Sequence, residues 1–239
     1  MNRMIIKTTL ITLLLFATGF NPIIAPVPVE PAEPSHLLDP TDRVQESIKI
    51  LHDIKSMDDE KTLPTSMIEK SEGIVILPEI VKAGFVIGGK HGKGIALIKD
   101  DNGEWSNPLF VKMTGGSIGW QIGAQKIELI LVFRDRDTVR SIANGEFEIG
   151  ADASATAGPV GRSASASTNA KLEAEIYSYS KSKGLFVGIS LDGSTLKMDD
   201  KRNDKFYGGD DVSASQIFSN KVNGPAGLLT ELKSALQNL

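Results

Sequence analysis

The 239-residue sequence contains no cysteine. This absence excludes a disulfide, a thiolate metal site, a cysteine nucleophile and a lipid anchor attached through cysteine, so packing alone must hold the fold together. Histidine is scarce as well: His36, His52 and His91 are too isolated to build a zinc site without carboxylate help. The aspartates at 199–211 lack the spacing of a calcium loop and are interpreted as solvated loop residues. We therefore predict no metal and no cofactor.

An excess of basic residues is also lacking. The formal net charge is −4 and the isoelectric point is about 5.5, which excludes the broad positive surface of a nucleic-acid-binding protein. Any surface that binds anions must therefore be local. We predict neither a nucleic acid nor a nucleotide as a partner.

Long apolar runs are missing except near the amino terminus. Within residues 1–20, Arg3 and Lys7 precede an apolar run of about 10 residues, which is typical of a signal peptide and shorter than the roughly 20 residues of a transmembrane helix. The small residues Ala17 and Gly19 suit cleavage. We expect an exported protein, periplasmic or secreted, and the alternative is an uncleaved leader that anchors the chain in a membrane.

Six prolines between residues 21 and 40 disfavour a helix and predict an extended tether. Residues 41–239 are then long enough for a single domain. Apolar residues at helical spacing predict a first helix at 41–57. We interpret this helix as docked on the domain, and the alternative is an amphipathic helix that faces a membrane, although its balanced charges weaken that attraction.

Further helices are predicted at the start of 63–78, at 135–145 and at 225–238, from caps and apolar spacing. A buried strand is predicted after the first of these, and alternating residues predict others at the following ranges: 84–90, 93–99, 104–112, 117–123 and 127–133. The alternation is clearest at 145–158 and 163–177, which flank a Gly-Pro turn and predict one long hairpin. We predict an α+β fold: a strongly curved antiparallel sheet or half-closed β-barrel with N-terminal, internal and C-terminal helices packed on it.

Two strings resemble enzyme motifs but lack the context that each motif needs. GGSIG at 115–119 matches a nucleophile elbow, yet strand-like sequence follows Ser117 and every histidine precedes it. GFVIGGK at 84–90 has the spacing of a P-loop, but His91 stands where Ser or Thr must ligate magnesium. We therefore predict no catalytic residues and no enzyme.

Four strings together resemble one known family. They are GWQIGAQ at 119–125, AGPVGR at 157–162, the segment 176–197 and NDKFYGG at 203–209. In this order they resemble the SYLF domain, also described as the lipid-binding or Las17-binding actin-regulator family, over residues 62–209. The resemblance implies binding of anionic lipids, notably phosphoinositides, and binding of actin as in some fungal members.

Basic residues at predicted turns are the candidate ligands for a lipid headgroup. Turns can gather ammonium and guanidinium groups and backbone N–H donors around one phosphate, and scattered surface lysines are the alternative interpretation. The candidates are Lys90, His91, Lys93, Arg162, Lys181 and Lys183. We predict a non-enzymatic module that binds anionic phospholipid at a membrane surface. The alternative is a protein-interaction module, either actin-binding or active in cell-envelope organisation.

Overall fold

The computed structural model describes residues 39–57, 62–119, 125–160, 174–182 and 185–239, and for 82–87, 117–119 and 125–126 it describes the backbone alone. All of these residues belong to one compact unit, Ser35–Leu239. The predicted leader, most of the predicted tether, the segment 163–173 and the candidates Arg162 and Lys183 lie outside the described residues.

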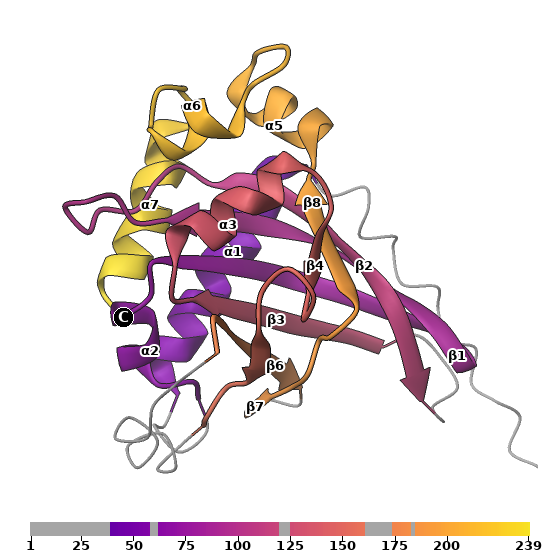
Figure 1. Ribbon diagram of the computed structural model, residues 1–239. Coiled ribbons are helices and arrows are strands. Elements are labelled where there is room, and N and C mark those ends of the chain that lie inside the picture. The colour runs from indigo at the N-terminus through magenta and orange to yellow at the C-terminus, as the bar shows by residue number, and fades with distance from the viewer. Residues whose placement is uncertain (1–38, 58–61, 120–124, 161–173, 183–184) are drawn as a thin grey trace, which may run out of the picture. The chain divides into compact units, whose positions relative to one another are not determined.

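One sheet of eight strands organises this unit (Figure 1). The strands are β1 (Gly73–Ile98), β2 (Leu109–Gly119), β3 (Gln125–Phe133), β4 (Phe147–Ile149), β5 (Ala155–Ala157), β6 (Ile176–Ser182), β7 (Leu185–Gly188) and β8 (Ser194–Met198). Their order is β4-β8-β2-β1-β3-β6-β5, and β7 also pairs with β6. A short turn joins the two end strands, and in it Ile149 bridges Ala153. The sheet therefore curves into a nearly closed barrel, which confirms the predicted α+β class.

β1 is longer than its neighbours because it folds back on itself. Its two ends meet where the Lys99 N–H donates to the Glu72 carbonyl at 2.9 Å. Further along, Gly94 lies against the backbone of Ile76 and leaves no room for a Cβ atom. The first half of β1 pairs with β3 and the second half with β2. The GFVIGGK string at 84–90 therefore lies in a strand, not in a loop that opens a helix.

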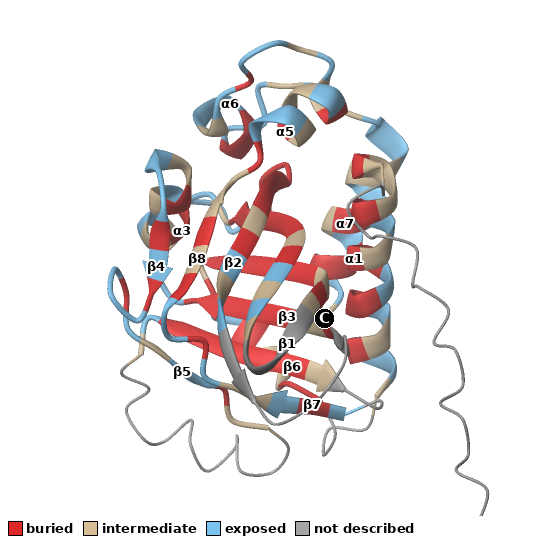
Figure 2. Ribbon diagram, turned by 90° about the vertical axis from the view of Figure 1, so that its right-hand side faces the viewer, coloured by how far each residue is buried: buried red, intermediate tan, exposed pale blue. Residues whose placement is uncertain are grey.

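Six α-helices accompany the sheet in the described part of the chain. They are α1 (Pro40–Ser56), α2 (Thr65–Glu69), α3 (Arg136–Ser141), α5 (Asp200–Tyr207), α6 (Ala214–Phe218) and α7 (Ala226–Gln237). One apolar layer fills the inside of the curved sheet, where strand residues meet Val139 of α3 and Ile217 of α6. A second layer lies on the outer face under α2 and under α1 and α7, which stand side by side in Figure 2. The outer face is therefore the face that carries most of the helical cover.

α1 confirms the predicted docked helix. A capping box between Asp39 and Asp42 starts it one residue before the predicted boundary, with Pro40 in the first turn. Its apolar stripe lies against the sheet, and each of these residues is at most 4% exposed: Val44, Ile48, Leu51 and Ile54. The stripe is therefore used within the fold and is not presented to a membrane.

The long hairpin predicted from 145–158 and 163–177 is wrong where the structure describes it. Residues 145–158 form two short strands, β4 and β5, which lie at the two ends of the strand order. Between them Gly150 has a φ of 93°, and the Asp152 carboxylate accepts a hydrogen bond from the Glu148 N–H at 2.6 Å. β5 then runs parallel to β6, not antiparallel. A turn thus interrupts an alternation that continues unbroken in the sequence.

The sequence patterns did not predict α5 and α6. The interpretation of the aspartates at 199–211 as solvated loop residues is wrong for at least two of them. Asp199 is only 5% exposed and precedes α5, and the Asp204 carboxylate accepts a hydrogen bond from the Val212 N–H at 2.9 Å. α3 and α7, in contrast, confirm their predictions, and Asp135 caps α3 through the Thr138 N–H.

Candidate functional site

A row of three lysines crosses the outer face of the sheet where the helical cover ends. Lys93 of β1 is opposite Lys112 of β2, which is opposite Lys197 of β8. Because side chains two residues apart share a face, the neighbouring rows lie on the same side. We call the whole set the basic face: Gly89, His91, Lys93, Lys112, Thr114, Gly116, Thr195 and Lys197.

The basic face is open to solvent at its centre. His91, Thr114 and the two glycines are exposed, and the three lysines are half-buried. In Figure 2, β2 changes along its length from buried to intermediate and exposed residues. Toward the helices the same face becomes apolar, and Phe110 packs on Phe206 of α5 with ring centroids 5.0 Å apart. The helices thus border the basic face and leave it uncovered.

The lysine row destabilises the folded sheet through repulsion between like charges. Directly opposite residues in an antiparallel pair have Cβ atoms about 5 Å apart, and like charges there are destabilising. Lys197 forms an ion pair with Glu146 at 3.3 Å, whereas no ion pair within the described residues neutralises Lys93 or Lys112. The pKa of Lys93 is lowered by partial burial and by the nearby charge of Arg202. The centre of the row therefore has a positive potential.

His91 adds hydrogen-bonding capacity without adding charge. Partial burial of its ring, together with the positive charges of Lys93 and Arg202, lowers its pKa. At pH 7 the imidazole is therefore neutral, and it offers one donor and one acceptor. The hydroxyls of Thr114 and Thr195 continue this polar row across β2 and β8.

Two arginines lie near the basic face but are engaged within the fold. Arg202 of α5 donates to the Asp199 carboxylate at 2.8 Å, and both side chains are largely buried. Arg43 of α1 is 1% exposed and pairs with Glu46 at 3.1 Å. Burial lowers the pKa of Arg43, although a guanidinium stays charged at neutral pH. These arginines strengthen the positive potential and do not themselves reach solvent freely.

α5 gives the basic face a rigid border. The buried Asn203 side chain accepts from the Phe110 N–H at 2.9 Å and donates to the Phe110 carbonyl at 3.1 Å, so it continues the hydrogen bonding of β2. The Tyr207 hydroxyl donates to the Pro108 carbonyl at 2.7 Å. These contacts fix the helix against the strand that carries Lys112.

The structure separates the six predicted headgroup ligands. His91 and Lys93 lie together on the basic face, but mid-strand and not at a turn as predicted, and Lys90 lies on the opposite face against Gly115. Lys181 is 14% exposed and its Nζ lies 2.6 Å from Asp53 and 3.3 Å from Glu128. The remaining two candidates lie outside the described residues.

Sequence reasoning missed Lys112 and Lys197, which complete the row with Lys93. Lys112 stands in a predicted strand, and both lysines alternate with buried apolar neighbours such as Val111 and Leu196. That alternation is a signal of an outward-facing side chain. It does not reveal which strands are neighbours, so the row itself could not be assembled from the sequence.

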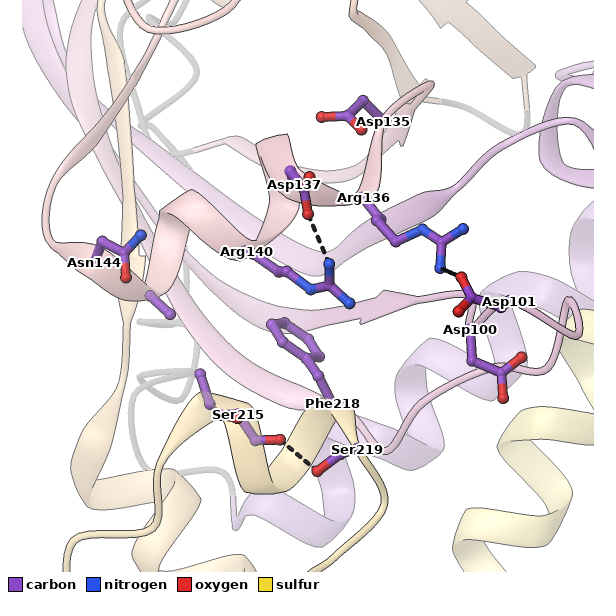
Figure 3. A pocket seen from close by; sticks show the side chains of 12 residues that line it. Asp100, Asp101, Asp135, Arg136, Asp137, Arg140, Asn144, Ser215, Phe218 and Ser219 are labelled. Carbon is purple, nitrogen blue, oxygen red and sulfur yellow. Dashed lines mark hydrogen bonds and ion pairs between the residues drawn. The ribbon is translucent and has the colours of Figure 1, made fainter.

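A second feature is a groove of about 890 Å³ between the turn at 100–103, α3 and α6 (Figure 3). Its charged groups are paired with one another: Arg136 with Asp101 and Arg140 with Asp137, each at 2.6 Å. The other two aspartates that line it accept hydrogen bonds from the turn and from the first turn of α3. The groove therefore offers few unsatisfied groups to a ligand.

Two absences hold for the part of the chain that the structure describes. No three side chains among its His, Asp and Glu converge where they could hold a metal ion. None of its helices combines the length and the apolar character that crossing a bilayer requires.

Comparison with known proteins gives a consistent family. The family model described as "Ysc84: Las17-binding protein actin regulator" matches residues 114–239. LAS seventeen-binding protein 3 of Saccharomyces cerevisiae is 34% identical over 169 residues, which are 70% of this chain and 36% of that protein. SH3 domain-containing YSC84-like protein 1 of Xenopus laevis is 34% identical over 167 residues, 70% of this chain and 50% of that protein.

A third relative is the SH3 domain-containing protein PJ696.02 of Schizosaccharomyces pombe. It is 35% identical over 186 residues, which are 75% of this chain and 43% of that protein. The chain thus spans between about a third and a half of the length of the curated relatives that it matches. None of these three relatives carries the name of an enzyme.

Proposed function

The chain belongs to the Las17-binding protein actin regulator family, and from this membership we propose that it is a non-enzymatic protein-interaction module of the actin-regulator kind. The relatives include a protein named for binding Las17. The proposed partner of this chain is accordingly a protein of that kind or the actin filament. The observation that carries the proposal within this molecule is the basic face, which is a partly exposed polar surface on three neighbouring strands.

The shape of the basic face supports protein binding over turnover of a small substrate. Small-molecule sites are usually concave and mostly apolar, with a few convergent polar groups, whereas protein interfaces are wide and often nearly flat. The basic face has charged and hydroxyl side chains on adjacent strands, and its two glycines have no side chain that would protrude from it. The groove in Figure 3 is concave, but its charges are already paired.

Sedimentation with actin filaments and capture by immobilised Las17 test the proposal. We would compare the full chain with a chain that lacks residues 1–34, which lie outside the compact unit. A longer deletion through residue 60 is unsuitable, because it removes α1 and uncovers the outer apolar layer. Binding to either partner by both chains supports the proposal, and failure of both chains to bind either partner contradicts it.

Anionic phospholipid is the second candidate, and one observation favours it. Lys93 and Lys112 face each other without an ion pair in the described residues, beside the neutral donor of His91. Such a cluster can bind a headgroup phosphate. Pelleting with vesicles that contain phosphoinositide or cardiolipin, compared with neutral vesicles, is the test. Equal and negligible pelleting in both would contradict lipid binding.

The compartment decides which of these partners the chain can meet. We propose that residues 1–20 direct export, on the pattern of Arg3 and Lys7 before a short apolar run. Export would exclude a cytosolic filament as the partner and leave a protein of the cell envelope, so the export proposal and the filament proposal exclude each other. Amino-terminal sequencing of the protein from its own host tests this, since an intact Met1 terminus would contradict cleavage.

A further inference from the structure

We propose that the basic face is the docking surface for an acidic, extended segment of a partner protein. This inference rests on the proposed function and adds the location and the chemistry of the contact. It follows from four properties of the face: its positive charge, its two glycines, the carboxylates of β4 beside it and the absence of apolar side chains on it.

The positive charge of the basic face would attract carboxylates of a partner, and the positions of the lysines define the spacing of those carboxylates. Neighbouring strands are about 4.8 Å apart, so the three lysines form a row roughly 10 Å long. In an extended chain, side chains on one side repeat about every 7 Å. Two acidic residues at alternate positions of such a segment would therefore both reach the lysine row. Carboxylates placed there would replace the repulsion between Lys93 and Lys112 with attraction.

Two glycines in the basic face allow the backbone of a partner to approach the sheet closely. Gly89 and Gly116 are opposite one another beyond the His91 row, and a Cβ on Gly116 would meet no atom within 4 Å. Positions without side chains on an exposed strand permit near contact with another chain. The hydroxyls of Thr114 and Thr195 and the neutral imidazole supply donors and acceptors for that chain.

The border of the face favours a polypeptide over a membrane. Glu148 of β4 is exposed opposite Thr195, and Glu146 pairs with Lys197 at 3.3 Å. These carboxylates would be pressed against a flat anionic bilayer and would repel it. A protein segment can avoid the repulsion, because it can present a polar or basic residue beside β4 and acidic residues over Lys93 and Lys112.

The basic face also lacks exposed apolar side chains, which membrane-binding surfaces combine with their positive charge. Peripheral attachment generally combines cations with apolar side chains that enter the bilayer. Within the residues that the structure describes, the exposed large hydrophobic side chains are Leu185 and Val187, and both lie on β7 at a different part of the sheet. The basic face is therefore suited to polar contacts with a protein.

Fluorescence anisotropy with a designed probe tests the docking surface. The probe is a short labelled peptide of alternating Glu and Ser, and its matched control has Lys in place of every Glu. We expect the full chain to bind the acidic probe, with an affinity that falls as salt rises. The double variant K93Q/K112Q should bind it about tenfold more weakly, because two charge contacts of roughly 0.7 kcal/mol each correspond to that factor.

A second double variant, K70Q/K221Q, removes the same charge from exposed lysines elsewhere and should bind like the wild type. Thermal melting of both variants shows whether they fold. Equal probe affinity for K93Q/K112Q and the wild type would overturn the assignment, and so would equal binding of the Lys-containing probe. Pelleting with anionic vesicles that depends on Lys93 and Lys112, without binding of the acidic probe, would overturn it in favour of a lipid surface.

The two proposals can fail separately. If the wild type and K93Q/K112Q are captured equally well by Las17 or actin filaments, the protein-interaction function stands and the basic face is not the docking surface. If the acidic probe binds through Lys93 and Lys112 but neither protein is captured, the chemistry of the face stands and the proposed actin-regulator function falls.

Discussion

Replacement of Lys181 by methionine should destabilise the domain without weakening partner binding. Lys181 of β6 connects three parts of the fold, because its Nζ contacts Asp53 of α1 at 2.6 Å and Glu128 of β3 at 3.3 Å. The ammonium also lies 5.9 Å from the centre of the Phe186 ring. Methionine keeps the apolar stem that packs there but removes the charge, so the two carboxylates lose a shared cation.

The expected loss lies between the values for exposed and buried ion pairs. The Lys181 side chain is 14% exposed, whereas those of Asp53 and Glu128 are 39% and 32% exposed. Exposed pairs contribute up to about 1 kcal/mol, and loss of one member of a buried pair costs roughly 3–5 kcal/mol. We expect the free energy of unfolding to fall by about 2 kcal/mol. In a domain of this size that corresponds to a melting temperature lower by about 4–8 °C.

The pH dependence of this loss has a defined sign. Burial alone would lower the pKa of Lys181, but its contacts with Asp53 and Glu128 outweigh burial and raise the pKa above its ordinary value of 10.5. A raised folded-state pKa stabilises the protein fully below the unfolded-state value, and the contribution disappears as pH rises through the folded-state value. The difference between wild type and K181M should therefore be constant near neutrality and shrink above about pH 10.5.

Urea unfolding monitored by circular dichroism measures this difference, and a double-mutant cycle with Asp53→Asn isolates the contact. Lys205→Met is the matched control, because Lys205 and Asp39 are 2.7 Å apart but 63% and 46% exposed. It should cost less than about 1 kcal/mol. An unchanged unfolding free energy for K181M, combined with lost binding to the acidic probe or to vesicles, would refute the reasoning and restore Lys181 as a ligand.

Three further predictions concern stability, each measured by the same unfolding assay. Lys112→Gln should stabilise the fold by about 0.5 kcal/mol because it relieves repulsion across the strand pair; destabilisation would contradict the lysine row. Asn203→Ala should cost about 1–3 kcal/mol, since it leaves the buried Phe110 N–H without its side-chain acceptor, whereas the Phe110 carbonyl keeps its hydrogen bond from the Asp199 N–H at 2.9 Å; a neutral result would mean that α5 is not fixed in this way. Gly94→Ala should cost about 3 kcal/mol or more, because a methyl group meets the backbone of Ile76; a normal melting temperature would show that β1 does not fold back as described.

Local signals predicted four of the six α-helices in the described residues, because a helix is made by neighbours in the sequence, but they missed α5 and α6. Asp135 caps the internal helix, and the apolar stripe of α1 is buried as one face. The strands were harder, because alternation shows that a residue is in a strand but not where the strand ends. At Gly150 the chain turns inside an alternating segment, and the first arm of the predicted hairpin, 145–158, forms β4 and β5.

The site illustrates the same limit. Lys90, His91 and Lys93 were predicted as one basic turn, but the strand places Lys90 on the other face of the sheet. Lys181 was predicted to be a ligand, and the packing of α1 on β6 made it the centre of an ion-pair cluster instead. Both cases show the same limit: the sequence shows which residues are basic, and burial and pairing decide which of those charges are available.

By itself, the sequence determined the chemistry that the protein can use and the elements that form locally. It excluded cysteine chemistry and a broad nucleic-acid surface, it specified the helical stripes and caps, and it carried the strings that identify the family. Only the tertiary structure decided that Lys93, Lys112 and Lys197 stand side by side. The physical reason is that the register between strands depends on backbone hydrogen bonds and burial summed over the whole sheet, and no local segment contains that information.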